Sequence, residues 1–239
     1  MAAAEVLVSE QTVAGVVLIA VPILFNAGFT MLAQRYDYPD VLRRPTHEVL
    51  ERFRAGGATL ILIWWAFALS AVLFGALAVL LAIAVDDADP TVVILGAVVG
   101  VIASLVQFLG LIRWPFLVPY LARVARDAEP DSPRGQAVDV VFQAFNRYLG
   151  VAVGEHLGYA FTGIWSILAG VALIDSTAAP DWLGVLGVVI GPLFLVCSLE
   201  FVGGFEDSGW KLAGAVTPVT YIGWSIWLVA IGIALLVDQ

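Results

Sequence analysis

The sequence predicts an all-α, polytopic membrane protein: a six-transmembrane-helix bundle, N-out/C-out, with short amphipathic cytoplasmic helices. Hydrophobic residues make up 61% of the 239 residues, and the mean hydropathy is +0.97. Soluble domains contain only about 45–50% apolar residues. Charged residues make up 13% of the chain and cluster between long uncharged stretches, as expected for membrane spans joined by loops. We therefore expect one membrane domain over residues 1–239.

Six apolar stretches are long enough to cross a bilayer, which takes roughly 17–25 residues. They run over about Thr12–Gln34, Ala58–Val85, Thr91–Ala122, Val151–Ile174, Leu183–Gly204 and Leu212–Val237. The acidic turn Asp86–Pro90 separates the second stretch from the third. Because backbone amides in lipid must be bonded within the segment, each stretch is expected to be a helix.

The basic residues predict the orientation. Loops one, three and five, with their span ends, hold ten of the eleven Lys and Arg residues: Arg35, Arg43, Arg44, Arg52, Arg54, Arg123, Arg126, Arg134, Arg147 and Lys211. The amino terminus, the second and fourth loops and the carboxyl tail hold none. Cytoplasmic loops are enriched in Lys and Arg, so loops one, three and five are expected in the cytoplasm. The expected location is the plasma (cytoplasmic) membrane, as a multi-pass protein.

Two cytoplasmic loops are expected to contain helices. In the first, Pro45 and Thr46 begin a helix that ends at Gly56 and Gly57. In the third, Ser132 and Pro133 resemble an N-cap and a first helical residue. The amphipathic segment Gln136–Leu149 follows, and we expect it to lie in the membrane interface. The alternative is a simple extension of the fourth span.

Ionisable groups within spans are costly in lipid and are therefore candidates for function. Four are present: Arg113, Glu155, His156 and Glu200. The proposed topology places them at a similar depth in the cytoplasmic half. Polar residues of the first and sixth spans fall in the same half, namely Asn26, Thr217 and Tyr221.

The simplest interpretation of these groups is pairing. Arg113 is expected within ion-pair distance of Glu155 or Glu200, because lipid cannot solvate an isolated charge. One arginine cannot neutralise both carboxylates. The second then binds His156 or Lys211, holds a proton, or faces a water-filled cavity. A structural ion pair, a small-molecule or proton site, and uncoupled interfacial anchoring remain open alternatives.

Other sites have little support in the sequence. The net charge of −9 argues against nucleic acid as a partner. No cofactor and no metal is expected, because no HExxH, CxxC or nucleotide-binding loop occurs. We expect membrane lipid as a partner, with a second membrane protein or a homo-oligomer as further possibilities. The favoured function is non-catalytic, as an accessory, lipid-binding or partner-binding protein. The alternative is a small transporter or membrane enzyme using a cytoplasm-facing cavity around Arg113, Glu155, His156 and Glu200.

Several short strings resemble a bacterial integral membrane family, domain of unknown function 4386. They are Phe25–Phe29, Asp37–Arg43, Arg113–Phe116, Arg147–Gly150, Gly154–Tyr159 and Gly209–Ala213. The resemblance covers nearly the whole chain. It implies six spans and a bacterial membrane, and it implies no particular activity.

Overall fold

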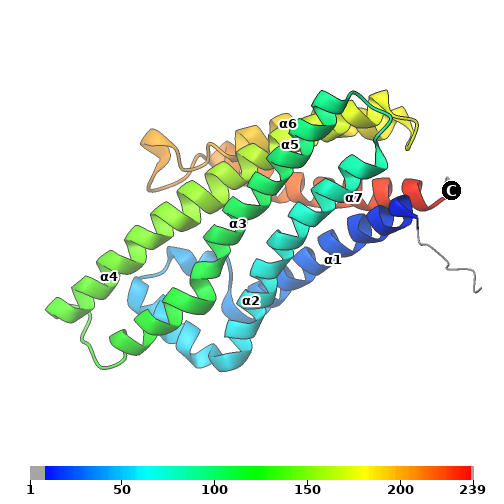
Figure 1. Ribbon diagram of the computed structural model, residues 1–239. Coiled ribbons are helices and arrows are strands. Elements are labelled where there is room, and N and C mark those ends of the chain that lie inside the picture. The colour runs from blue at the N-terminus through cyan, green and yellow to red at the C-terminus, as the bar shows by residue number, and fades with distance from the viewer. Residues whose placement is uncertain (1–8, 238–239) are drawn as a thin grey trace, which may run out of the picture.

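A computed structural model describes residues 9–237, and within them the chain forms helices and connecting turns without any strand (Figure 1). The helices are α1 (Glu10–Tyr36), η1 (Asp40–Arg43), α2 (Thr46–Ala84), α3 (Pro90–Ala125), α4 (Pro133–Phe145), η2 (Asn146–Leu157), α5 (Gly158–Asp175), α6 (Asp181–Cys197), η3 (Gly203–Phe205) and α7 (Lys211–Val237). Here η1 and η3 are 3₁₀-helices, and η2 is a π-helix.

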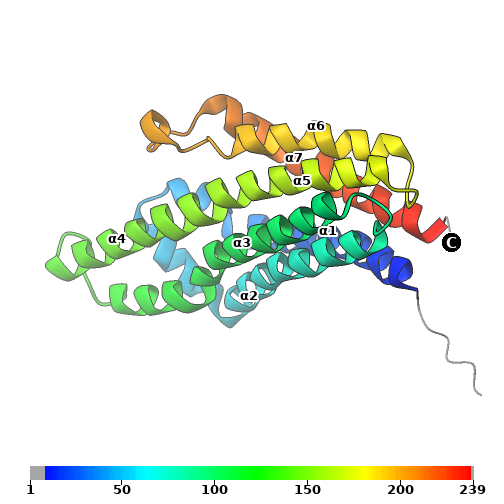
Figure 2. The same ribbon diagram turned by 45° about the horizontal axis from the view of Figure 1, so that its top comes forward.

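The long helices pack as a closed ring. Helix α1 packs against α2, and α2 packs against α3. Helix α3 packs against α5, α5 against α6, and α6 against α7. Helix α7 packs against α1, which closes the ring. Figure 2 shows the α5–α6 layer lying over the α2–α3 layer, with α1 and α7 behind. A closed ring leaves every long helix with one face toward its neighbours and one face outward.

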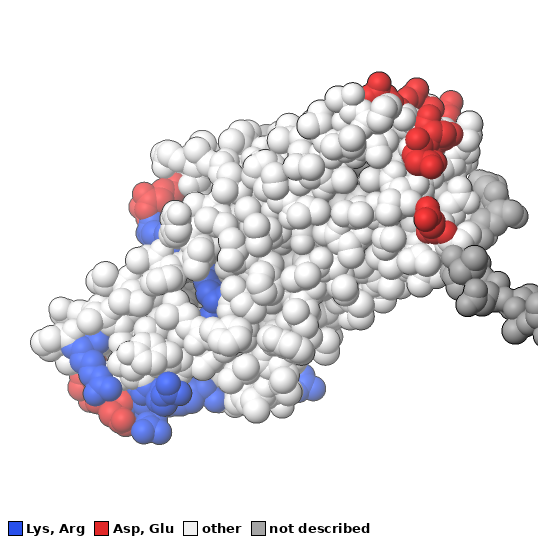
Figure 3. Space-filling model, viewed as in Figure 1, with Lys and Arg blue, Asp and Glu red and all other residues white. Residues whose placement is uncertain are grey.

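The bundle has two chemically different ends. Both described chain ends and the turns 85–89 and 176–180 lie at one end, called the acidic end (Figure 1). The connections 37–45, 126–132 and 198–210 lie at the other, called the basic end. Figure 3 shows acidic groups at the first end, basic groups mixed with acidic ones at the second, and an almost uncharged surface between them. This separation agrees with the loop pattern expected from the sequence.

Five helical segments are long and apolar enough to cross a membrane: α1, α2, α3, the continuous run Pro133–Asp175, and α7. The helix α6 is apolar but has only 17 residues. The predicted span 183–204 is therefore too long at its end, because the helix stops at Cys197. From Ser198 the backbone forms successive turns, with Ser198 Oγ donating to the Leu195 carbonyl at 2.8 Å.

The expected helix break after the first basic loop is confirmed. The helix α2 begins at Thr46, and its backbone leaves helical geometry at Gly57, with φ 57° and ψ −153°. A backbone in this region is open mainly to glycine. The break separates a short segment at the basic end from the long apolar segment that follows. The expected cap at Ser132 is also confirmed, since its side chain accepts from the Gly135 N–H at 3.1 Å.

The prediction that residues 136–149 form a separate helix in the membrane interface is wrong. The structure instead shows the alternative, in which this segment extends the fourth predicted span. Helix α4 continues through η2 into α5 as one run of 43 residues (Figures 1 and 2). The apolar face of α4 is covered by protein in part: Val138 and Phe142 are only 6% and 5% exposed, whereas Val141 and Phe145 are 38% and 43% exposed. The ring of Phe142 lies 6.4 Å from that of Trp114 on α3. Packing against α3 therefore holds α4 in line with the bundle.

Large apolar side chains cover the outward faces of the bundle. Examples are Ile94, Phe116, Val219 and Ile226, each at least 62% exposed. Inside, α5 and α6 approach closely at glycines: a Cβ added to Gly170 would lie 2.5 Å from the Gly184 carbonyl oxygen. Apolar outer faces and glycine contacts between helices are both typical of membrane bundles.

Candidate functional site

Arg113 lies inside the bundle, on the half of α3 nearer the basic end, and is 9% exposed. Its Nη2 donates to Asn146 Oδ1 at 2.9 Å, and its Nη1 donates to the Gly110 carbonyl of its own helix. The guanidinium carbon lies 5.3 Å from the Trp114 ring centre. These contacts supply hydrogen-bond acceptors and a π face to the cation.

The expected ion pair of Arg113 with Glu155 or Glu200 is wrong. Among residues 9–237, the basic side chains that form ion pairs are Arg43, Arg44, Arg52, Arg126 and Arg147. Arg113 and Glu155 interact only as charges at a longer distance. The reason is local: the guanidinium occupies the space beside Gly150, where an added Cβ would lie 2.5 Å from Nη2, and that position directs it to Asn146.

The π-helix η2 carries Asn146, Glu155 and His156. Twelve residues is long for a π segment, since most are single-turn bulges, frequently at functional sites. The wider π geometry places the small residues of η2 against α3: a Cβ on Gly154 would lie 3.0 Å from the Gly110 Cα. This segment is therefore the structural centre of the candidate site.

His156 and Glu200 serve the turn that follows α6. The His156 Nδ1 lies 2.7 Å from the Ser198 carbonyl oxygen, which can only accept, so the ring N–H donates. The backbone carbonyl of Glu200 accepts from the Trp210 N–H at 2.6 Å. The Glu200 carboxylate lies beside Gly214, where an added Cβ would be 2.8 Å from Oε1. Both residues thus help to close the connection between α6 and α7.

The carboxylates of Glu155 and Glu200 both lack a hydrogen-bond or ion-pair partner within the described part of the chain, but only Glu155 lies in a helix long and apolar enough to cross a membrane. Glu155 is partly buried. Its charge acts on Arg113, on Tyr38, and on two tyrosines whose rings are in contact, Tyr159 and Tyr221. The two tyrosine rings contact edge to face at 5.5 Å. Tyr221 therefore belongs to the electrostatic surroundings of Glu155.

Asn26 belongs to a different contact. Its Nδ2 donates to Ser225 Oγ at 3.0 Å and to the Pro22 carbonyl at 2.7 Å. Thr217 donates to the Ala213 carbonyl within its own helix at 2.9 Å. Asn26 thus joins α1 to α7, and within residues 9–237 neither Asn26 nor Thr217 is hydrogen-bonded to Arg113.

A cavity of about 770 Å³ opens at the basic end. It is bounded by the first turns of α2, the last turn of α3 with the following loop, and α4. Its apolar lining includes Leu50, Ala122 and Val138, its charged lining consists of Glu51, Arg54, Arg126, Asp131 and Asp139, and His47 also lines it. The volume lies within the range of about 300–1,000 Å³ that small-molecule sites occupy.

One wall of this cavity is held by a hydrogen-bonded group between α2 and α4. Thr46 donates to the Asp139 carboxylate, and the Gln143 side chain donates to Thr46 Oγ1 at 3.0 Å. The other charged residues of the lining, all of them within the described chain, form no ion pair with one another. Glu51, Arg54 and Asp131 form no ion pair with any residue from 9 to 237, and Arg126 pairs with exposed Asp127 at 3.2 Å.

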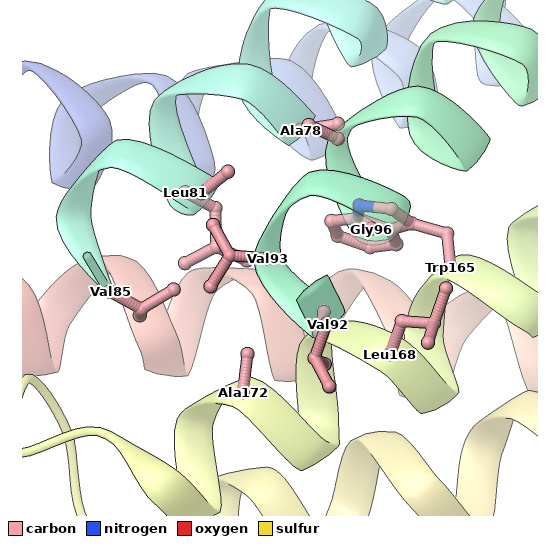
Figure 4. A pocket seen from close by; sticks show the side chains of 12 residues that line it. Ala78, Leu81, Val85, Val92, Val93, Gly96, Trp165, Leu168 and Ala172 are labelled. Carbon is pink, nitrogen blue, oxygen red and sulfur yellow. The ribbon is translucent and has the colours of Figure 1, made fainter. Parts of the chain in front are cut away.

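A second pocket lies between α2, α3 and α5 near the acidic end (Figure 4). Its labelled side chains are apolar, and Trp165 covers one side of it. The space inside is about 10 Å³, which is about the volume that one water centre needs. Without polar lining groups this pocket has no evident chemistry.

The acidic end is organised by Asp87. Its carboxylate accepts from Ser176 Oγ at 2.5 Å and from the Thr177 N–H and Oγ1 at 2.8 and 2.7 Å. The Ser176 hydrogen bond, followed by those of Thr177, lowers the pKa of Asp87 to about 2. These contacts join the two acidic turns. No group of three or more metal-ligating side chains occurs in residues 9–237.

The sequence singled out the ionisable residues of this region and missed their neutral partners. Asn146 precedes Arg147 near a predicted interface, so it gave no sign of a buried role. Gly150 had a visible signal, because glycines let helices approach closely. The contact between Thr46 and Asp139 joins residues 93 positions apart, and no local pattern predicts it.

Comparison with curated proteins and with solved structures finds no match. The family described as Domain of unknown function (DUF4386) matches residues 13–232, which cover α1 through most of α7. The match includes Arg113, the π-helix η2 and the lining of the basic-end cavity. With the helical bundle and its polar cluster described above, this match over most of the sequence shows that the chain belongs to the DUF4386 family.

Proposed function

We propose that the chain crosses the membrane of a bacterial cell six times, with α6 as a short fifth span and with both ends outside. The 17 residues of α6 extend about 25 Å at ~1.5 Å per residue, close to the hydrocarbon thickness of about 30 Å. Its packing between α5 and α7 supports a span. The arginines of the basic end support a cytoplasmic location for that end.

We infer that the molecular role is non-catalytic binding of membrane lipid. The cavity of about 770 Å³ at the basic end carries this proposal. It combines apolar side chains with charged ones, as an amphipathic ligand requires, and in the proposed topology it lies beside the cytoplasmic leaflet. The bonding of Arg113 supports a structural role for the buried arginine, because its partners are neutral groups of the protein.

Native mass spectrometry of the protein purified in mild detergent tests this proposal. We expect a bound lipid of defined mass. Ala125→Trp places an indole in the cavity and should remove that lipid, since Ala125 is part of the lining. Ala144→Trp is the matched control, because Ala144 is exposed on α4 outside the lining. Absence of lipid from the wild type, or equal retention by both variants, would contradict the proposal.

A second candidate is a small transporter or membrane enzyme that uses Glu155. The observation in its favour is a carboxylate in a membrane-span candidate without a hydrogen-bond or ion-pair partner in the described chain. Infrared spectra across a pH titration test it. A proton-handling Glu155 gives a protonated-carboxyl band that disappears in Glu155→Gln and stays in Glu200→Gln. If the spectra of both variants match the wild type, the second candidate is wrong.

A further inference from the structure

The basic-end cavity presents paired opposite charges on two of its walls. Glu51 and Arg54 stand three residues apart on α2, a spacing that places them on the same helix face. On the other side, Arg126 follows α3 and Asp131 lies in the loop before α4. Each wall therefore carries one cationic and one anionic group, and because Arg126 is also paired with exposed Asp127 at 3.2 Å, a ligand at that wall shares the guanidinium with this carboxylate.

This arrangement fits a zwitterionic ligand better than a purely anionic one. A phosphate group alone would meet Arg54 and Arg126 but would also face Glu51 and Asp131, and like charges at close range are unfavourable. A ligand that carries a phosphate and an ammonium satisfies both kinds of lining group. Asp139 needs no ligand, since its carboxylate accepts from Thr46.

We propose that this cavity binds a phosphoethanolamine headgroup, with the phosphate at Arg54 and Arg126 and the primary ammonium at Glu51 and Asp131. The proposal rests on the lipid-binding function above and names the ligand class for the same cavity. Arginine matches phosphate geometry through its fork of N–H donors. A primary ammonium donates hydrogen bonds to carboxylates.

The lining also separates primary from quaternary ammonium groups. Proteins recognise choline-type cations with cages of aromatic rings. Apart from His47, none of the residues that line the cavity is aromatic. A trimethylammonium group has no N–H to donate to Glu51 or Asp131. The cavity therefore favours phosphoethanolamine over phosphocholine.

The phosphoethanolamine group could belong to a membrane lipid or to a soluble ester. The lining favours the lipid, because the same cavity also contains the accessible apolar residues Pro45, Ala125 and Val140. Alkyl carbons placed against these side chains are removed from water, at about 25 cal/mol per Å² of apolar surface. A soluble headgroup ester lacks these carbons.

The experiment is a binding titration of the delipidated full-length protein, followed by native mass spectrometry. The probes are phosphatidylethanolamine, phosphatidylcholine and phosphatidylglycerol with identical acyl chains, and soluble glycerophosphoethanolamine. We expect phosphatidylethanolamine to bind about tenfold more tightly than the other two lipids, as one extra charge-assisted hydrogen bond would give. Glycerophosphoethanolamine should compete only weakly.

Two double variants locate the headgroup. Glu51→Gln with Asp131→Asn should abolish the preference for phosphatidylethanolamine while keeping lipid binding. Arg54→Gln with Arg126→Gln should weaken the binding of all three lipids. Glu48→Gln and Arg123→Gln are controls, because both residues lie near the cavity but outside its lining.

The possible failures are distinguishable. Equal binding of the three lipids, or an unchanged preference in the carboxylate variant, overturns the headgroup assignment and leaves the lipid-binding function intact. Failure of every lipid to bind overturns both. Glycerophosphoethanolamine binding as tight as that of the lipid would retain the headgroup chemistry and overturn the lipid as its source.

Discussion

Arg113 is held by neutral partners. A charged side chain within a span is costly, and natural proteins offset that cost by pairing or by hydrogen bonds. Here the acceptors are the Asn146 amide oxygen and the Gly110 carbonyl, and the Trp114 ring lies against the guanidinium. Because the partners come from α3 and η2, the arginine joins two helices that are separated in the chain by the third loop.

Replacing Asn146 tests that role. Asn146→Ala removes one acceptor of a buried cation, and hydrogen bonds to charged groups contribute about 1.5–3 kcal/mol. We expect a loss of that size in the free energy of unfolding, measured by SDS titration in mixed micelles. Asn146→Asp keeps an acceptor at the same place and should retain most of the stability. Wild-type stability in the alanine variant would show that the contact is dispensable.

Asp87 gives a pH-dependent prediction. Its pKa is lowered from 3.8 to about 2 in the folded chain, first by the Ser176 hydrogen bond. A lowered folded pKa stabilises the fold above the unfolded pKa, and this contribution is lost as the pH falls from about 3.8 through about 2. We therefore expect the melting temperature of the wild type to be higher than that of Asp87→Asn at pH 6.

The difference in melting temperature between wild type and Asp87→Asn should shrink as the pH approaches 2. Asp86→Asn is the matched control, since Asp86 is exposed and no hydrogen bond to its carboxylate is found in the described chain. A difference that stays constant from pH 6 to pH 2 would mean that the Asp87 contacts do not depend on its charge.

At the scale of the helices, Gly57 divides α2 into two segments with different roles. The segment before it carries Glu51 and Arg54 to the cavity, and the segment after it is a span candidate. The backbone at Gly57 has φ 57° and ψ −153°. Such a conformation costs a side-chain-bearing residue on the order of 1–3 kcal/mol.

Gly57→Ala should therefore lower the free energy of unfolding by about 1–3 kcal/mol. Crowding cannot cause the effect, because nothing lies within 4 Å of an added Cβ at this position. Gly223→Ala in α7 is the control: its added Cβ also meets open space, and its backbone is helical. Equal stability of the two variants, measured by SDS titration, would argue against a strained backbone at Gly57.

The sequence predicted elements with strong local signals. Long apolar stretches gave the main helices, Gly56 and Gly57 gave the break in α2, and Ser132 gave the start of α4. The continuity of α4 with α5 was not predicted as the favoured alternative, because it depends on η2. A π segment has no clear sequence signal, and here it depends on contacts between Gly154 and Gly110 from another helix.

The candidate site was predictable only in part, because the sequence identifies some of its residues but not the contacts between them. Arg113, Glu155 and His156 are recognisable because ionisable residues are rare inside apolar stretches. Their partners were not, since the Arg113–Asn146 and His156–Ser198 contacts join positions 33 and 42 residues apart. The sequence predicts which residues are costly in lipid, whereas the packing of the helices decides which groups form hydrogen bonds with them.

At the scale of the whole molecule, the ring of helices separates its charges by end. The turns of the acidic end are joined by Asp87, and Asp175 accepts from the Asp89 N–H at 2.7 Å. At the basic end, Arg147 pairs with Glu206 and with Asp207, which ties η2 to the connection before α7. In the proposed topology, the apolar belt between these ends lies in a bilayer, with the basic end in the cytoplasm.

Cysteine accessibility in intact cells tests that topology most directly. In a Cys197→Ser background, which removes the only native thiol, single cysteines replace Asp86 at the acidic end or Arg134 at the basic end. Both positions are exposed. We predict that a membrane-impermeant maleimide labels position 86 in intact cells and position 134 only after permeabilisation. Labelling of position 134 from outside, with position 86 protected, would contradict the orientation, and labelling of both in intact cells would contradict the span count.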